Sequence, residues 1–165
     1  MIGVNNAVRI ANNAFVNCIL LADSTLMTVG TYSEYLGLPG VNQTLTPLPI
    51  SGIPKVVDIK SNFNSTIALT TNGDVYFWGA DGTAVYYEPT KIDSLNNIVA
   101  ISGCDDGYHF LALDQDKNCY AWGGSAWGDT TFGQLGSSDS AYYTIDSPVL
   151  VATDVIDILA GETFN

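Results

Sequence analysis

The chain has 165 residues, 47% of them hydrophobic and 13% charged, with 17 acidic against 5 basic residues. This composition predicts a single folded domain with a sizeable core and excludes a disordered chain. A net charge of −12 with singly scattered cations disfavours nucleic-acid and anionic membrane partners, because both require clustered Lys and Arg.

Residues 1–7 lack the basic start and apolar run of a secretory signal, and the apolar stretch 14–22 is too short to span a membrane. The three cysteines, Cys18, Cys104 and Cys119, are too few and odd in number for a disulfide framework. They show no C-x-x-C spacing, so we expect them to act as small apolar residues. These features leave the localisation of the protein open.

After this short extension the chain repeats itself. Residues 8–30 align with residues 57–79 without a gap, and residues 99–123 repeat the pattern with two extra residues. Residues 156–165 begin the pattern a fourth time. Successive starts at 8, 57, 99 and 156 lie 49, 42 and 57 residues apart. We therefore expect an extension, three units and the start of a fourth: 1–7, 8–56, 57–98, 99–155 and 156–165.

Each unit predicts three β-strands and a further short extended run. In the second unit the strands are 57–59, 67–69 and 75–78. Between the last two, Asn72-Gly73 predicts a two-residue hairpin turn, because both residues tolerate positive φ. The third strand ends at a Gly, and a variable loop then leads to a Pro and into the extended run.

The third strands are apolar on both faces, which favours sheets that are covered on both sides. Among antiparallel repeat architectures, blades stacked face to face around an axis have this pattern. No segment shows helical periodicity over a dozen residues. The sequence therefore predicts an all-β protein, a β-propeller with blades of about fifty residues. The ring would be incomplete, with about three blades and the first strand of a fourth.

The third unit resembles the repeat of the regulator of chromosome condensation family. It contains the Ala112-Leu113 strand, Trp122-Gly123, the run Gly-Gln-Leu-Gly at 133–136 and Pro148. The second unit lacks that run, and the first has Val29 where Trp is usual. The resemblance implies a closed propeller, usually of seven blades, so we expect a longer polypeptide or other chains to complete the ring.

Two polar features are interpreted as structural. His109, the only histidine, falls where the family often has a turn histidine near its GTPase-binding face, but the equivalent Ser65 and Phe164 do not continue a ring of histidines. Residues 114–118 resemble the opening of a calcium loop, yet Cys119 and Ser125 replace the required Gly and Glu. We expect a backbone-bonded turn histidine and a hairpin turn, with no catalytic, cofactor or metal site.

Aromatic residues in the variable loops are the best candidates for partner binding. Trp127 lies in the long loop 124–132, outside the repeated frame, and six tyrosines fall in the inter-strand loops. Aromatic side chains among Ser, Gly, Asn and Thr are typical of contact surfaces, although packing explains them equally well. The predicted partner-binding residues are Trp127, Tyr32, Tyr35, Tyr86, Tyr87, Tyr142 and Tyr143.

These observations favour a non-enzymatic interaction or structural module that binds other protein chains. Its polar, uncharged surface composition resembles that of structural and receptor-contacting components of bacteriophage particles. The family resemblance supplies an alternative, a guanine-nucleotide exchange factor for a small GTPase, although the net charge of −12 opposes the chromatin contacts of such a factor. A minor alternative is carbohydrate binding through Trp127 and Tyr143.

Overall fold

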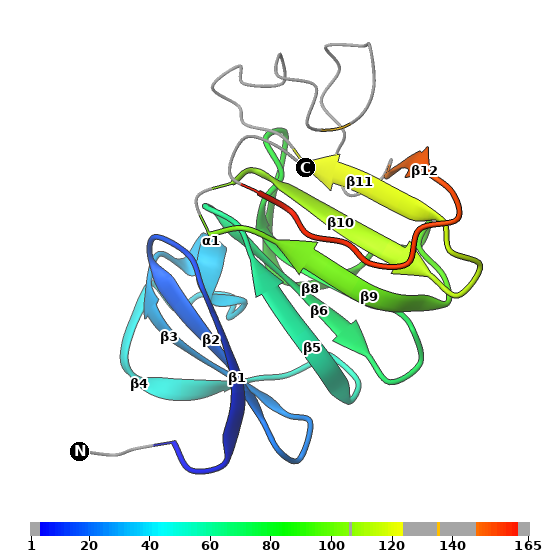
Figure 1. Ribbon diagram of the computed structural model, residues 1–165. Coiled ribbons are helices and arrows are strands. Elements are labelled where there is room, and N and C mark those ends of the chain that lie inside the picture. Colours follow the sequence, from blue (N-terminus) through cyan, green and yellow to red (C-terminus); the bar gives the residue numbers. More distant parts are fainter. Residues whose placement is uncertain (1–3, 106, 124–134, 136–147, 162–165) are drawn as a thin grey trace.

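The computed structural model describes residues 4–105, 107–123, 135 and 148–161. In this part of the chain, strands β1 to β12 form three four-stranded antiparallel sheets, which follow one another along the chain (Figure 1). Blade 1 contains β1 (Ala7–Asn12), β2 (Val16–Leu21), β3 (Leu26–Thr31) and β4 (Gln43–Ile50). Blade 2 contains β5 (Val56–Ser61), β6 (Ser65–Thr70), β7 (Val75–Ala80) and β8 (Val85–Lys91). Blade 3 contains β9 (Ile98–Gly103), β10 (His109–Asp114), β11 (Cys119–Gly123) and β12 (Val149–Ala152).

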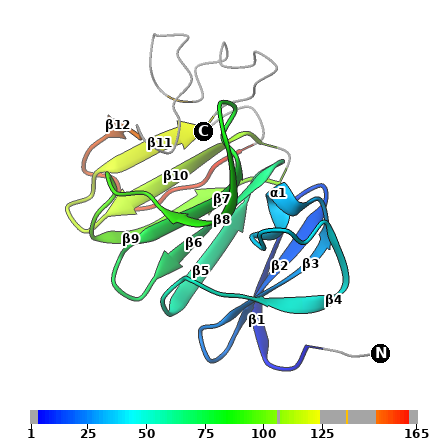
Figure 2. The same ribbon diagram turned by 180° about the vertical axis from the view of Figure 1, so that it is seen from behind.

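The three sheets are arranged radially, with their first strands side by side at the centre. Strand β5 lies between β1 and β9, and it contacts both of them. The views from the two sides agree on this arrangement (Figures 1 and 2). The predicted all-β fold and partial propeller are therefore confirmed.

Equivalent residues fill the interfaces between blades. On one face of blade 2, Ile59, Ala68 and Trp78 join a core cluster with blade 1. On its other face, residues such as Ile67 and Phe77 join a cluster with blade 3. Both faces of the middle sheet are thus covered, and this explains why strand β6 is buried at every position.

The two repeated tryptophans occupy the same setting. Trp78 and Trp122 are completely buried, each on the face that its blade turns toward the preceding blade. In each case a glycine with positive φ follows the Trp, Gly79 at +114° and Gly123 at +106°. A Cβ atom at Gly79 would lie 2.5 Å from the backbone of Asn64 and Ser65, so no other residue fits there.

The hairpin turns differ from the sequence prediction. The Asn72-Gly73 turn is a three-residue loop, closed by hydrogen bonds from Thr70 N to Asp74 O (2.9 Å) and from Gly73 N to Thr70 O (3.1 Å). Only Gly73 has positive φ. The prediction of two-residue turns was therefore wrong. A three-residue loop needs only one residue in the left-handed region, and Gly73 supplies it.

The same turn also joins each blade to the next. Gly73 and its equivalents Ser24 and Lys117 have φ between +65° and +80°. The carbonyl of Ser24 accepts a hydrogen bond from Val56 N (3.0 Å), and that of Gly73 accepts one from Ile98 N (3.1 Å). In both cases the donor is the first residue of the next blade, so one turn closes a hairpin and sets the position of its neighbour.

The fourth strands are the outer edges of the blades. The sequence predicts only a short extended run here, and the structure places β4, β8 and β12 against the third strands. Pro47 and Pro49 lie within β4 and Pro89 lies within β8, as an edge position allows. A short helix, α1 (Ser33–Leu36), follows β3 and contacts β7 of the neighbouring blade.

The segment that follows β12 continues the repeat without forming a strand in the described residues. It lies across the third sheet beside β9 and β10 (Figure 1). Val155 N bonds Lys117 O (3.0 Å), as Val56 and Ile98 bond the two earlier turns, and Ala160 N bonds Ser102 Oγ (2.9 Å). Residues 155–160 therefore occupy the place of a fourth inner strand.

Candidate functional site

The two ends of the blades differ in what their connections carry. At one end, called here the hairpin end, lie the tight turns between second and third strands. At the other, called the loop end, lie the connections from first to second and from third to fourth strands. The loop end of all three blades carries aromatic side chains.

Five rings form a continuous row across the loop end, and this set is called the aromatic row. It consists of Phe15, Tyr32, Tyr35, Phe63 and Tyr108. Phe15 stacks on Tyr35 with ring centroids 5.1 Å apart, and the edge of Tyr32 meets it at the same distance. Phe63 links blade 1 to blade 3, with its ring 6.2 Å from Phe15 and 5.3 Å from Tyr108.

The rings of the aromatic row are partly open to solvent. Tyr32 is 52% exposed, and the other four are half-buried. Tyr32 also has φ +70° and ψ 115°, a conformation that is costly for a bulky residue. Strained residues of this kind persist where the surrounding structure holds them, here through the bond from Tyr32 N to Asn42 O (2.7 Å), and they cluster at sites of ligand contact.

Asparagine side chains hold the turns that carry two of the rings. Asn13 Oδ1 accepts hydrogen bonds from Phe15 N (2.9 Å) and Val16 N (2.8 Å). Asn62 Oδ1 accepts a hydrogen bond from Asn64 N (3.2 Å) in the same way, and another from the Ser65 hydroxyl (2.6 Å). These are the turn-forming bonds that Asn makes readily, and they fix the backbone that presents the rings.

The hydroxyl of Tyr35, a residue of α1, stays protonated. Partial burial, the nearby Glu34 carboxylate and Tyr32 raise the pKa of Tyr35 above its usual value. Its phenol is therefore neutral at physiological pH and can donate a hydrogen bond to a partner.

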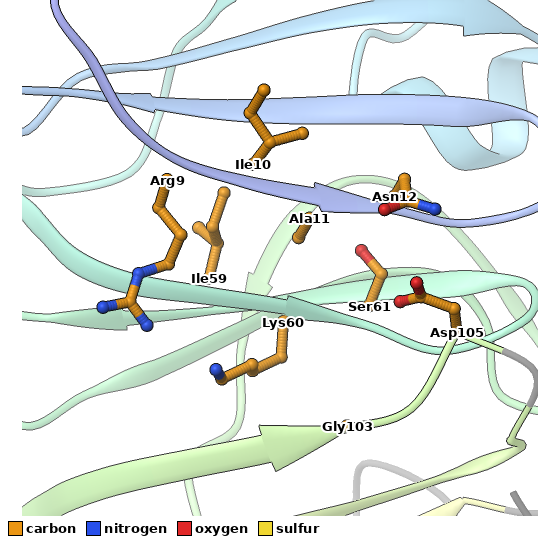
Figure 3. Close-up of a pocket in the computed structure, with 9 residues that line it drawn as sticks. All are labelled: Arg9, Ile10, Ala11, Asn12, Ile59, Lys60, Ser61, Gly103 and Asp105. Carbon is orange, nitrogen blue, oxygen red and sulfur yellow. The ribbon is translucent and has the colours of Figure 1, made fainter.

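Residues on or just after the three inner strands line an open cavity of about 310 Å³ (Figure 3). Arg9 and Lys60 lie on one side of it, and Arg9 Nη1 is 2.6 Å from Asp58 Oδ1. On the other side the polar side chains of Asn12, Ser61 and Asp105 approach one another (Figure 3). The cavity thus has a cationic side and, near the loop end, a polar side.

The predicted partner-binding residues fall into three groups. Tyr32 and Tyr35 come together in the aromatic row. Tyr86 packs its edge on Phe77 with centroids 5.5 Å apart, whereas Tyr87 is 47% exposed on the edge strand β8. The remaining three lie outside the described residues: Trp127, Tyr142 and Tyr143.

Sequence reasoning did not single out Phe15, Phe63 or Tyr108. A signal was available, since each unit has an aromatic residue in the connection after its first strand. The signal is obscured because the three residues lie 7, 6 and 9 positions after their unit starts at 8, 57 and 99.

The polar residues interpreted as structural have internal roles. His109 is buried in β10, where it pairs with Gly123. The carboxylate of Asp114 accepts hydrogen bonds from Asp116 N (2.9 Å), Asn118 N (2.8 Å) and Asn118 Nδ2 (3.0 Å). These bonds close a hairpin turn.

The cysteines are free thiols, and Cys18 and Cys119 are buried in strands. Burial raises the pKa of Cys18 to about 12, so its thiol is not a nucleophile at neutral pH. Within the described residues, no group of three or more His, Cys, Asp or Glu side chains is placed to hold a metal ion. The described residues also include no helix long and apolar enough to cross a membrane.

No protein-family model matches the chain. The probable E3 ubiquitin-protein ligase HERC6 of Homo sapiens is 28% identical to it over 128 residues, which are 70% of this chain and 12% of that protein. The guanine nucleotide exchange factor SRM1 of Saccharomyces cerevisiae is 32% identical over 89 residues, 46% of this chain and 18% of that protein.

Among solved structures, Prp20p of Saccharomyces cerevisiae superposes with a TM-score of 0.70 and 20% identity. The match covers 97% of this chain and 42% of Prp20p. The chain therefore spans less than half the length of each of these proteins.

Stacked four-stranded blades, repeated buried tryptophans and inner strands at the centre of the radial arrangement define a partial β-propeller. The superposition on Prp20p agrees with this fold. The Trp-Gly repeats resemble those of the regulator of chromosome condensation family.

Proposed function

We propose that this chain is a non-enzymatic protein-interaction module whose contact surface is the aromatic row. The observation that carries the proposal is that partly exposed rings from all three blades meet at one end. Aromatic side chains offer a large contact area and lose little conformational entropy on binding, so they dominate many interfaces.

The comparisons support a role in protein binding. The structural study of Prp20p concerns its binding to Gsp1p and histones, which are proteins. The blades provide a rigid frame, whereas the loop end carries connections of unequal length, an arrangement that suits contact surfaces.

A second protein contact is proposed at the segment 155–160, where further blades would complete the propeller. Ile156 and Leu159 are 86% and 81% exposed, and among the described residues the segment has no strand partner of the kind that β1, β5 and β9 each have. The partner is a β-sheet, either from further repeats of the same polypeptide or from another chain. Cross-linking through a cysteine at position 159 tests this contact.

We further propose that the protein belongs to a large assembly, in particular as a structural or receptor-contacting component of a bacteriophage particle. Its support is compositional, because the surface depends on Asn, Ser, Thr and Gly more than on charge. Sedimentation of the native protein tests it, since the chain should migrate with particles. Recovery of the native protein as a free monomer would contradict it.

The alternative is a guanine-nucleotide exchange factor, which the match to SRM1 favours. The test is the release of a fluorescent guanine nucleotide from a small GTPase. Stimulation by this chain would establish the activity, and release at the intrinsic rate would remove this alternative for the 165-residue chain.

The main proposal is tested with a photo-crosslinking residue in place of Tyr32, and with a matched control in place of the exposed Asp93 at the hairpin end. The expected result is a discrete cross-linked protein from the source cells at position 32 and none at position 93. Equal cross-linking at the two positions would contradict the proposal.

A further inference from the structure

The two ends of the molecule differ in charge as well as in aromatic content. In the described part of the chain, the connections at the loop end include residues 13–15, 32–42, 62–64, 81–84, 104–105 and 107–108. These residues contain three acidic side chains, Glu34, Asp81 and Asp105, and no Lys or Arg.

The five cations lie elsewhere. Lys55 precedes β5, Lys117 lies in a hairpin turn, and Lys91 at the end of β8 bonds Asp74 at 2.7 Å, so all three are at the hairpin end. Arg9 and Lys60 are on inner strands, where both face Asp58, at 2.6 and 4.0 Å. Within the described residues, none of the five cations therefore lies in the connections that carry Glu34 and Asp105.

Two of the acidic residues belong to the same connections as rings of the aromatic row. Glu34 lies in α1 between Tyr32 and Tyr35, and Asp105 is exposed three residues before Tyr108. Asp105 also lines the cavity beside Asn12 and Ser61, where side-chain oxygens can accept hydrogen bonds (Figure 3). Two carboxylates thus belong to the connections that carry the rings.

We propose that the aromatic row binds an extended protein segment rich in Arg and Lys. Guanidinium and ammonium groups are attracted to the faces of aromatic rings, and the carboxylates beside the rings complement their charge. The net charge of −12 of the chain also speeds the approach of such a segment. This inference rests on the proposed contact surface and names the chemistry of its partner.

The probe is a short labelled peptide of alternating Arg and Ser, compared with the same peptide carrying Glu in place of Arg. Binding to the full chain is measured by fluorescence anisotropy. We expect the Arg peptide to bind and the Glu peptide not to bind, with an affinity that falls as salt is added.

Variants separate a specific site from general attraction to an acidic protein. The pair Glu34→Gln and Asp105→Asn should weaken Arg-peptide binding about tenfold, and so should Phe63→Ala, because each removes one class of contact. The matched control pair, Asp93→Asn and Asp116→Asn, removes two exposed charges at the hairpin end and should change the affinity less than about twofold. Tyr32→Phe keeps the ring and should bind as the natural chain does.

Any of three results would overturn the inference. The control pair could weaken Arg-peptide binding as much as Glu34→Gln with Asp105→Asn does, Phe63→Ala could bind the Arg peptide as the natural chain does, or the Glu peptide could bind as tightly as the Arg peptide. The buried Trp78 and Trp122 report folding of each variant by their fluorescence. A partner that cross-links at position 32 without preferring the Arg peptide would leave the contact surface in place and reject only its proposed chemistry.

Discussion

At the hairpin end the three blades are nearly interchangeable, whereas at the loop end each blade differs from the other two. The hairpin end repeats one three-residue turn with one positive-φ residue, and the carbonyls of Ser24, Gly73 and Lys117 accept bonds from Val56, Ile98 and Val155, where the next inner strand or its equivalent begins. The loop end has connections of unequal length, the strained Tyr32 and a row of partly exposed rings.

The difference separates residues that build the fold from residues that are free to make contacts. A turn that must hold two blades together tolerates little variation, so Ser24, Gly73 and Lys117 share a backbone conformation despite their different side chains. At the loop end a backbone bond from Phe63 N to Gly107 O (2.9 Å) joins blades 2 and 3, but the connections vary in length and side chain from blade to blade. The predictions below test this separation, in order of decreasing effect.

The largest effect is expected at a residue that the repeats share. Trp78→Ala should lower the free energy of unfolding by about 4 kcal/mol, because it leaves a cavity between blades 1 and 2. Chemical denaturation measures the change, with Trp78→Phe as the milder control. A loss below about 1 kcal/mol would show that the ring does not join the blades.

Two positive-φ glycines of blade 2 differ in how closely the backbone surrounds them. Gly79→Ala should cost about 3 kcal/mol, because its Cβ would meet the backbone of Asn64 and Ser65 in a positive-φ conformation. Gly73→Ala should cost about 1 kcal/mol, since Ser24 and Lys117 adopt the same conformation elsewhere. Equal costs in a denaturation experiment would contradict the difference between the two positions.

Substitutions in the aromatic row should affect binding much more than stability. Tyr32→Gly should leave the free energy of unfolding within about 1 kcal/mol of the natural value, because relief of the positive-φ strain offsets the lost ring contacts. The same substitution should weaken Arg-peptide binding. A variant that unfolds readily would instead assign Tyr32 to the fold.

The smallest effect concerns pH. Burial acts to raise the pKa of Asp114, but hydrogen bonds from Asn118, Asp116 and Tyr120 outweigh it and hold the pKa below its usual value. A lowered carboxyl pKa stabilises the fold above the unfolded-state pKa of about 3.9, and this contribution is lost as the pH falls through the folded-state pKa. Thermal unfolding below about pH 4 should therefore depend on pH less steeply in Asp114→Asn than in the natural chain.

The sequence predicted most of the repeated architecture because the repeats place the same residue types in the same environment. Trp78 and Trp122 aligned in sequence and proved equivalent in space. The hairpin turns were predicted less well, since Asn72-Gly73 is compatible with two loop lengths and the bond to the next blade favours the longer one.

The aromatic row could be predicted only in part. Tyr32 and Tyr35 were singled out by their place in a loop, but Phe15, Phe63 and Tyr108 come from three units whose connections differ in length. Their proximity arises from the radial arrangement of the blades, which brings the connections together at one end. A single sequence shows their presence without showing that they meet.

Hydrogen exchange of the chain, free and bound to the protein that cross-links at position 32, tests the central claim most directly. The account predicts that binding protects the backbone amides of the turns at 13–15 and 62–64, and leaves exchange at the hairpin turns 22–25 and 71–74 unchanged. Protection confined to those hairpin turns would place the contact surface at the opposite end and contradict it.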